Sequence, residues 1–155
     1  MPDEDIHTGL KGMERHPGRA LTNVLTRGVP FHELDAIQML WHGNYVKLLE
    51  EGREAFGEQY GLSYRSIFEH GYTVPVVDLH IRYLQSARMG DRLVIETTCV
   101  PVRSAKLAFN YIIRRESDRA VLATADTVQL FVTRDGTFDP STPEFVSAWR
   151  AQWRI

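Results

Sequence analysis

An acidic side chain, Asp35, precedes a His-x-Asn-Tyr sequence, His42 to Tyr45, in the segment FHELDAIQMLWHGNY that begins at Phe31. The residues after Asn44 have the pattern of a helix, and the start of a helix carries unpaired N–H groups and about half a positive charge. A carbonyl oxygen placed there is polarised, and one donor to a developing oxyanion contributes about 3 kcal/mol. A carboxylate facing that carbonyl can attack it or activate water. These residues therefore favour acyl transfer from a thioester, whose thiolate leaves readily.

Each of these residues also has a structural interpretation. Asp is common in loops where it caps a turn, and a lone histidine is more often structural than catalytic. The pairing of Asp35 with the His-x-Asn-Tyr sequence favours function for Asp35, whereas the side chain of His42 fits either role. The remaining histidines show no metal-ligand spacing, so we predict no metal site and no cofactor.

A long helix over residues 44–61 is the clearest element. Asn44 is suited to cap its first turn and Gly61 to end it. Gly52 lies in the middle of the apolar stripe, where its missing side chain would let a sheet approach closely. The stripe has the spacing of a helix face that packs on a core and consists of Tyr45, Leu48, Leu49, Gly52 and Phe56.

Five strand-like runs surround this helix in the sequence. The first precedes the helix and contains Pro30 near its end, and short turns separate the other four, which indicates an antiparallel meander. Residues 62–70 are irregular or form one short helical turn. Ser141 to Glu144 has the pattern of a helix start, followed by the apolar residues of a short amphipathic helix. The runs cover residues 21–32, 72–84, 91–102, 105–116 and 119–133.

This order predicts an α+β fold in which a five-stranded antiparallel sheet wraps one long helix. One helix covers such a sheet only partly, so we expect a second copy of the chain to bury the rest. The predicted organisation is an N-terminal tail over residues 1–20, a domain over residues 21–135, and a C-terminal extension with the amphipathic helix over residues 136–155.

Composition limits the function classes. The net charge of −2 argues against binding to nucleic acid or to a membrane surface. No apolar stretch has the ~20 residues that span a bilayer, and the acidic N-terminus does not resemble a signal peptide. Cys99 is the only cysteine, which excludes an intrachain disulfide and indicates a reducing compartment. We therefore expect a cytoplasmic protein in which Cys99 is a buried strand residue without chemistry.

The segment from Phe31 to Tyr45 resembles the signature of the 4-hydroxybenzoyl-CoA thioesterase family. The family pattern is Tyr/Phe-x-Asp-x-Asp, a glycine, and then His-x-Asn-Tyr at the start of a helix with Glu and Arg three residues apart, here Glu50 and Arg53. Gly90-Asp91 matches a further family feature before a strand. The resemblance covers residues 22–133. It implies a hot-dog fold, a dimer with a continuous sheet and often a tetramer, with thioester hydrolysis at the dimer interface.

The resemblance places Asp35 on the family's catalytic carboxylate, acting as nucleophile or general base. His42 falls on the residue whose backbone N–H polarises the thioester carbonyl, and in related members its side chain assists. Asn44 and Tyr45 belong to the expected substrate-binding segment chiefly by shaping the loop and the helix start. Trp41 would border an aromatic acyl pocket, although core packing explains it as well.

The chain departs from the family pattern at three positions. Glu33 replaces the first Asp, and Ile37 and Gln38 replace the usual glycines. The bulkier side chains would narrow the acyl pocket or change the bend of the loop, which bears on the substrate more than on the reaction.

Several charged residues have two interpretations. Four cations at strand ends or turns would contact the phosphates of coenzyme A or of an acyl carrier protein, although each alone also fits a solvated surface. These are Arg82, Arg88, Arg103 and Lys106. Glu50 and Arg53 fit a surface ion pair along the helix, with Glu50 lining the site as the alternative.

The leading hypothesis is a thioesterase that hydrolyses an acyl-CoA or acyl-carrier-protein thioester. A hot-dog dehydratase or hydratase acting on 3-hydroxyacyl thioesters is an alternative, although the usual His-x-x-Gly-x-Pro run of those enzymes is missing. A non-catalytic acyl-binding module is a third hypothesis, which Ile37 and Gln38 keep open.

Overall fold

The computed structural model describes residues 20–155, so the predicted tail lies almost wholly outside the described residues. The helices are α1 (Asn44–Tyr60), α2 (Tyr64–Glu69) and α3 (Glu144–Trp153), with one 3-10 turn, η2 (Phe31–Glu33). The strands are β1 (Leu21–Gly28), β2 (Tyr72–Thr73), β3 (Val76–Tyr83), β4 (Arg92–Val100), β5 (Lys106–Arg115), β6 (Val121–Leu130) and β7 (Val132–Thr133).

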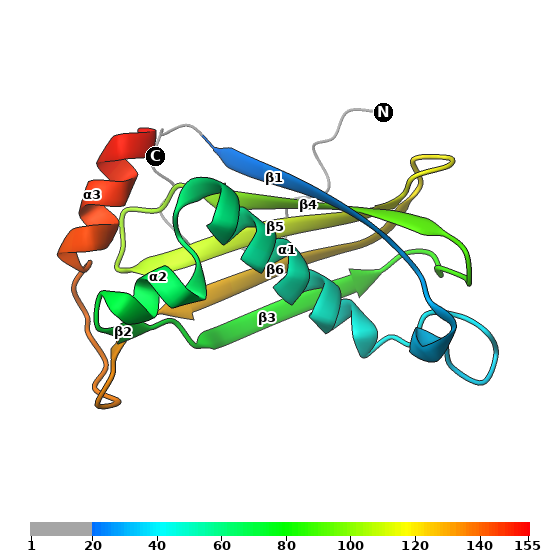
Figure 1. Ribbon diagram of the computed structural model, residues 1–155, viewed down its shortest axis with the longest axis horizontal. Helices are drawn as coiled ribbons and strands as arrows, with labels where there is room; N and C mark the ends of the chain where they lie inside the picture. Colours follow the sequence, from blue (N-terminus) through cyan, green and yellow to red (C-terminus); the bar gives the residue numbers. More distant parts are fainter. Residues whose placement is uncertain (1–19) are drawn as a thin grey trace.

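Five strands form one antiparallel sheet in the order β1-β4-β5-β6-β3, and β2 pairs with β7 in a separate ribbon. The long helix α1 crosses one face of this sheet and packs on β1 and β4 (Figure 1). This confirms the predicted α+β class, with a five-stranded antiparallel sheet around one long helix. Because α1 covers only part of the face, the sheet beside β3 stays open.

The predicted meander is wrong for one of its four strands. β4, β5 and β6 follow one another in space, but β3 pairs with β6 at the far edge of the sheet. A meander would need the turn at Gly90, which has a φ of 84°, to pair β4 with β3. The two strands are not neighbours in the sheet. Instead, β1 pairs with β4 along the whole of β1, and beside the turn Val29 N donates to the carbonyl of Asp91 at 3.0 Å. Residues 84–91 therefore cross the end of the sheet, below the start of α1.

Three of the predicted strands end early or are interrupted, two of them next to a proline and one at a buried phenylalanine. The first strand ends at Gly28, before Pro30, and the run over residues 72–84 breaks at Pro75, which has no N–H for a ladder. Phe131 separates β6 from β7 in the last run and is fully buried. Residues 62–70 contain α2, whose first turn is capped by Ser63 Oγ accepting from Ser66 N at 3.1 Å.

Helix α1 lies close to the sheet as predicted. A Cβ at Gly52 would stand 2.4 Å from Thr97 Oγ1, so only glycine permits this approach. Gly61 ends the helix with a φ of 76°. The prediction for Asn44 is wrong: Gly43 occupies the cap position, and Asn44 Nδ2 donates to the carbonyl of Glu33 at 2.8 Å. Asn44 thus joins the preceding loop to the helix.

The predicted surface pair of Glu50 and Arg53 does not form, because only 1% of Arg53 is exposed. Its guanidinium donates to Gln129 Oε1 and to the carbonyl of Leu62, whereas Glu50 accepts from the hydroxyl of Tyr64. Burial lowers the pKa of Arg53. The Arg53 side chain therefore lies in the core, between α1 and the sheet.

Cys99 lies buried in β4, as predicted. Burial raises the pKa of its thiol to about 12, so the nucleophilic thiolate is scarce near neutral pH.

The predicted C-terminal helix is confirmed as α3, which begins after Pro143. It packs against the end of α1 rather than standing apart. The indole N–H groups of Trp149 and Trp153 both donate to the carbonyl of Tyr60, at 2.8 and 3.0 Å, and so cap the last turn of α1. None of the helices within residues 20–155 is long and apolar enough to cross a membrane.

Candidate active site

The loop between β1 and α1 is held from two sides. Leu40 N donates to the carbonyl of Ala87 in the crossing segment at 2.8 Å, and Met39 forms a bridge with Arg88. From the helix side, the Glu33 carbonyl accepts from Trp41 N at 3.1 Å as well as from the side chain of Asn44. These bonds fix the loop relative to both the helix start and residues 84–91.

The Glu33 side chain anchors the same loop. Its carboxylate is buried and binds both terminal nitrogens of Arg27, with Nη1 to Oε2 at 3.1 Å. Arg27 also reaches Glu51 on α1, with Nε to Oε2 at 3.4 Å. The hydrogen bond to Glu33 raises the pKa of Arg27. Glu33, where the family has Asp, therefore serves as an ion-pair partner that ties the loop to β1 and α1.

Asp35 has one engaged oxygen and one open oxygen. Oδ1 accepts from Ile37 N at 3.0 Å and from Met39 N at 3.1 Å, which is the turn-capping role that Asp often has in loops. Within residues 20–155, Oδ2 has no hydrogen-bond partner. The cap holds the carboxyl rigidly and leaves Oδ2 available to a substrate or a water.

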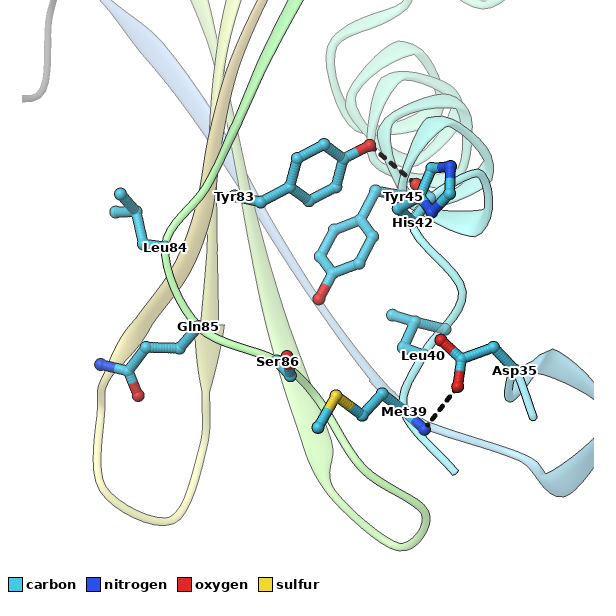
Figure 2. Close-up of a pocket in the computed structure, with 9 residues that line it drawn as sticks. All are labelled: Asp35, Met39, Leu40, His42, Tyr45, Tyr83, Leu84, Gln85 and Ser86. Carbon is cyan, nitrogen blue, oxygen red and sulfur yellow. Dashed lines mark hydrogen bonds between the residues drawn. The ribbon is translucent and has the colours of Figure 1, made fainter. Parts of the chain in front are cut away.

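A cavity of about 250 Å³ lies between this loop, the start of α1 and the end of β3. Asp35 comes from the loop, Tyr45 from the first turn of the helix and Tyr83 from β3 (Figure 2). The rings of Tyr45 and Tyr83 meet edge to face, with centroids 5.0 Å apart. The lining consists of Asp35, Met39, Leu40, His42, Tyr45, Tyr83, Leu84, Gln85 and Ser86.

The start of α1 beside this cavity offers free backbone donors. Among residues 20–155, no acceptor is present for the N–H groups of His42 and Gly43. The first turn of α1 contains no acidic residue that would offset its positive end. A Cβ at Gly43 would stand 2.4 Å from the indole of Trp41, so glycine lets that ring lie over the helix start.

Tyr45 is a buried side chain, of which only 2% is exposed. Burial is the main cause that raises its pKa. Tyr45 therefore presents a neutral hydroxyl at the cavity at physiological pH.

The predicted site residues fall into two groups. Asp35, His42 and Tyr45 line the cavity. Trp41 stands beside His42 with ring centroids 5.3 Å apart, and Asn44 is buried behind the loop.

The four predicted cations are spread over the chain. Arg88 is exposed in the crossing segment that borders the cavity, and Arg82 is exposed on β3. Arg103 and Lys106 lie where β4 turns into β5, next to α3, whose Arg150 donates to the carbonyl of Lys106 at 2.7 Å. This is the end of the sheet opposite the cavity (Figure 1). Within one chain, these two cations do not reach the site.

Sequence reasoning missed most of the cavity wall. Met39 and Leu40 lie within the signature segment, but an apolar side chain there gives no reason to predict that it lines the site. The others come from the end of β3 and the crossing segment, and no local pattern marks them because their position depends on the crossing connection. They are Tyr83, Leu84, Gln85 and Ser86. Within residues 20–155, no group of His, Cys, Asp or Glu side chains is placed to hold a metal ion.

Gln38 has a φ of 63°, a left-handed conformation that favours glycine. We expect Gln38→Gly to raise the free energy of unfolding by up to about 1 kcal/mol, because the steric cost of the side chain is larger than the added chain entropy. Urea denaturation at fixed protein concentration measures this. Arg119→Gly is the matched comparison, because Arg119 has a φ of 59° in the turn between β5 and β6. This variant should raise the free energy of unfolding by a similar amount. A loss of stability in both variants would contradict the expectation.

The comparisons with known proteins agree with this architecture. The family model described as the thioesterase-like superfamily matches residues 29–150. YneP of Bacillus subtilis, provisionally named an acyl-CoA thioesterase, is 29% identical over 83 residues, which cover 54% of this chain and 60% of that protein. The chain thus spans less than two thirds of that relative's length.

Two further similarities are informative. The 1,4-dihydroxy-2-naphthoyl-CoA hydrolase of Thermosynechococcus vestitus is 27% identical over 99 residues, covering 63% of this chain and 68% of that protein. The solved structure of Slr0204, a 1,4-dihydroxy-2-naphthoyl-CoA thioesterase from Synechocystis, superposes with a TM-score of 0.74 at 20% identity, covering 84% of this chain and 96% of that one. The structural match confirms the hot-dog fold. The chain belongs to the thioesterase-like superfamily.

Proposed function

We propose that this protein is a thioesterase that hydrolyses acyl-CoA to the free acid and coenzyme A, with Asp35 as its catalytic carboxylate. One observation carries the proposal: Asp35, which has an open carboxylate oxygen, and His42, whose N–H has no acceptor among residues 20–155, line the same cavity. The names of two curated relatives support the substrate class, since YneP and the naphthoyl-CoA hydrolase are both named for CoA thioesters. An acyl-carrier-protein thioester is the alternative substrate with the same reacting group.

In the proposed reaction, the thioester carbonyl oxygen accepts from the backbone N–H of His42 at the start of α1. Asp35 either attacks the carbonyl carbon through Oδ2 or removes a proton from an attacking water. The oxyanion that forms is stabilised by the helix start, and the C–S bond then breaks as the thiolate leaves. In the nucleophilic route, water hydrolyses the resulting anhydride and releases the acid. The imidazole of His42 at the rim is placed to exchange protons with water.

A panel assay tests this function. The purified protein is incubated with acyl-CoA and acyl-carrier-protein thioesters, and free thiol and released acid are measured together. Equal release of thiol and acid supports the proposal. Conversion of a 3-hydroxyacyl thioester to an enoyl product would instead show a dehydratase, and saturable binding without turnover would show an acyl-binding module.

We further propose that the working unit is a dimer joined through β3. This strand pairs with β6 on one side only, so the backbone groups of its other edge are open to a second strand. Three of its apolar side chains, Val76, Val77 and Leu79, are exposed although they stand in a sheet, as are Tyr83 at its end and Leu84 just after it. A second copy that adds its β3 in antiparallel register would continue the sheet and cover the open face beside α1.

The dimer proposal predicts that Leu79→Glu yields a monomer. Leu79 is 40% exposed in the single chain, so the charge costs little in the monomer but would be buried in the dimer. Light scattering coupled to size-exclusion chromatography measures the mass, which should halve. Val24→Glu on the opposite edge strand β1 is the matched control, because Val24 is also exposed. A dimer that survives Leu79→Glu would argue against the β3 interface.

A further inference from the structure

We propose that two copies of β3 pair in one particular register, with His80 opposite the partner's His80 on the two-fold axis and Asp78 opposite the partner's Arg82. The proposal rests on the β3 dimer inferred above and names the residues that join the two chains. β3 lies at the outer edge of the sheet, where β6 is its one neighbour among residues 20–155 (Figure 1). The register decides which residue of the second copy lies beside the cavity.

The backbone of β3 limits the registers that a second strand can take. Leu84 N, just after β3, donates to the carbonyl of Leu122 on β6 at 2.8 Å. In an antiparallel ladder every second residue bonds to the same neighbour, so His80 also turns its N–H and C=O groups toward β6. The backbone groups of Leu79 and Ile81 then face outward, and such residues must pair with one another across the dimer. Near the middle of β3 this leaves three registers, with Leu79, His80 or Ile81 on the two-fold axis.

The two faces of β3 differ in chemistry. Ile81 packs against the core and the ring of Tyr83 contacts Tyr45 of α1, so the odd-numbered residues lie on the helix side of the sheet. Three polar residues, all exposed, alternate on the opposite face: Asp78, His80 and Arg82. Within residues 20–155, the side chains of Asp78 and His80 have no hydrogen bond or ion pair. This face of the edge strand therefore offers charges that a second copy can meet.

Charge complementarity selects one of the three registers. With His80 on the axis, Asp78 stands opposite the partner's Arg82, and the symmetry repeats this pair on the other side of the axis. With Leu79 on the axis, Asp78 would face a histidine in place of an arginine. With Ile81 there, the partner's Arg82 would face His80. Opposite charges directly across an antiparallel pair stabilise it, and side chains approach most closely at positions whose backbones are not bonded to each other, as here.

The same register brings a residue of the second copy to the cavity. Counting outward from His80, Leu79 stands opposite the partner's Ile81, and Tyr83 stands opposite the partner's Val77. Tyr83 and Val77 are 48% and 54% exposed in the single chain, and this pairing would cover both. Because Tyr83 lines the cavity, the partner's Val77 extends the cavity wall on the β3 side.

Cysteine cross-linking measures the register directly. In an antiparallel homodimer only the residue on the axis stands opposite its own copy, with Cα atoms about 4.5 Å apart, a distance that a disulfide can span. We expect His80→Cys to form a disulfide-linked dimer under mild oxidation in about tenfold greater yield than Leu79→Cys or Ile81→Cys, whose copies would stand roughly 8 Å apart. The unaltered chain is the background control, since Cys99 is buried. A link that forms best at position 79 or 81, or at none of the three, would overturn the register.

Charge reversal tests the pairing of Asp78 with Arg82 without cysteine chemistry. Asp78→Arg and Arg82→Asp should each raise the dissociation constant of the dimer about tenfold, because each change places like charges opposite each other twice in the dimer. The variant with both substitutions restores opposite charges and should dimerise like the unaltered protein. Sedimentation equilibrium at several concentrations measures these constants, and a double variant that stays as weak as the single ones would contradict the pairing.

Neither experiment depends on turnover, so the register and the proposed function can fail separately. A protein that links through His80→Cys but hydrolyses no thioester would keep the register and lose the thioesterase assignment. A protein that hydrolyses thioesters but links at another position, or remains a monomer, would keep the activity and lose the register.

Discussion

Replacing Asp35 with Asn is expected to lower kcat/KM for thioester hydrolysis by about 10²–10⁴-fold, the usual contribution of a positioned acid–base or nucleophilic group. Asparagine keeps an oxygen that can accept from Ile37 N and Met39 N, so the turn should persist. What is lost is the negative charge and the open carboxylate oxygen. Thiol release under saturating and limiting substrate measures the change, and binding of a non-hydrolysable thioether analogue should be retained.

The matched control for this substitution is Asp139→Asn. Asp139 also caps its own loop, with Oδ1 accepting from Ser141 N at 2.9 Å, and it does not line the cavity. Both variants remove one carboxylate from a capped turn, and only the Asp35 variant should lose activity. If Asp35→Asn hydrolyses thioesters as fast as the unaltered protein, the catalytic assignment of Asp35 is wrong. Asp35→Ala should lose stability as well, because the turn loses its cap.

The second large effect concerns stability and involves the buried guanidinium of Arg53. Gln129→Leu is expected to lower the free energy of unfolding by about 3 kcal/mol or more. The Gln129 side chain accepts from Arg53 Nε at 3.0 Å and donates to Tyr64 Oη and to the carbonyl of Val74. Leucine has a similar size but makes none of these bonds. The charge of Arg53 would then stay buried, and among residues 20–155 the carbonyl of Leu62 would be its one remaining acceptor.

A double-mutant cycle shows whether the buried charge causes that loss. Arg53→Met removes the charge and keeps much of the volume, although it leaves Gln129 Oε1 unpaired. In the double variant neither partner remains, so its loss should be smaller than the sum of the two single losses by about 1–3 kcal/mol. Urea denaturation of the four proteins at one concentration gives these values. Additive losses would mean that the two side chains stabilise the fold independently.

Arg134→Met is the control for the removal of an arginine. Arg134 also lies over an aromatic ring, 4.4 Å from the centroid of Phe68, and donates to the carbonyl of Phe68, but it is exposed. Arg53 lies between the rings of Tyr64 and Phe109, at 4.8 and 4.7 Å. Similar contacts on a solvated side chain should contribute less than about 1 kcal/mol. The difference between the two positions then measures the effect of burial.

Local patterns in the sequence were enough to determine the elements and the chemistry-bearing segment. The stripe from Tyr45 to Phe56 has helical spacing, so α1 and its buried face followed from it. Gly52 and Gly61 could be interpreted correctly because glycine has few uses inside a helix and at its end. The pairing of Asp35 with the His-x-Asn-Tyr sequence located the loop and the helix start that now border the cavity.

Tertiary structure alone decided which segments meet. The partner of β3 depends on long-range pairing, since β1 occupies the edge of β4 that a meander would have given to β3. This placed Tyr83 and residues 84–86 opposite Asp35. The burial of Arg53 was equally unpredictable, because helix spacing places Glu50 and Arg53 near each other but does not show that Gln129 and Leu62 would meet the guanidinium. Short-range propensity fixes elements, whereas the free energy of packing the whole chain fixes their neighbours.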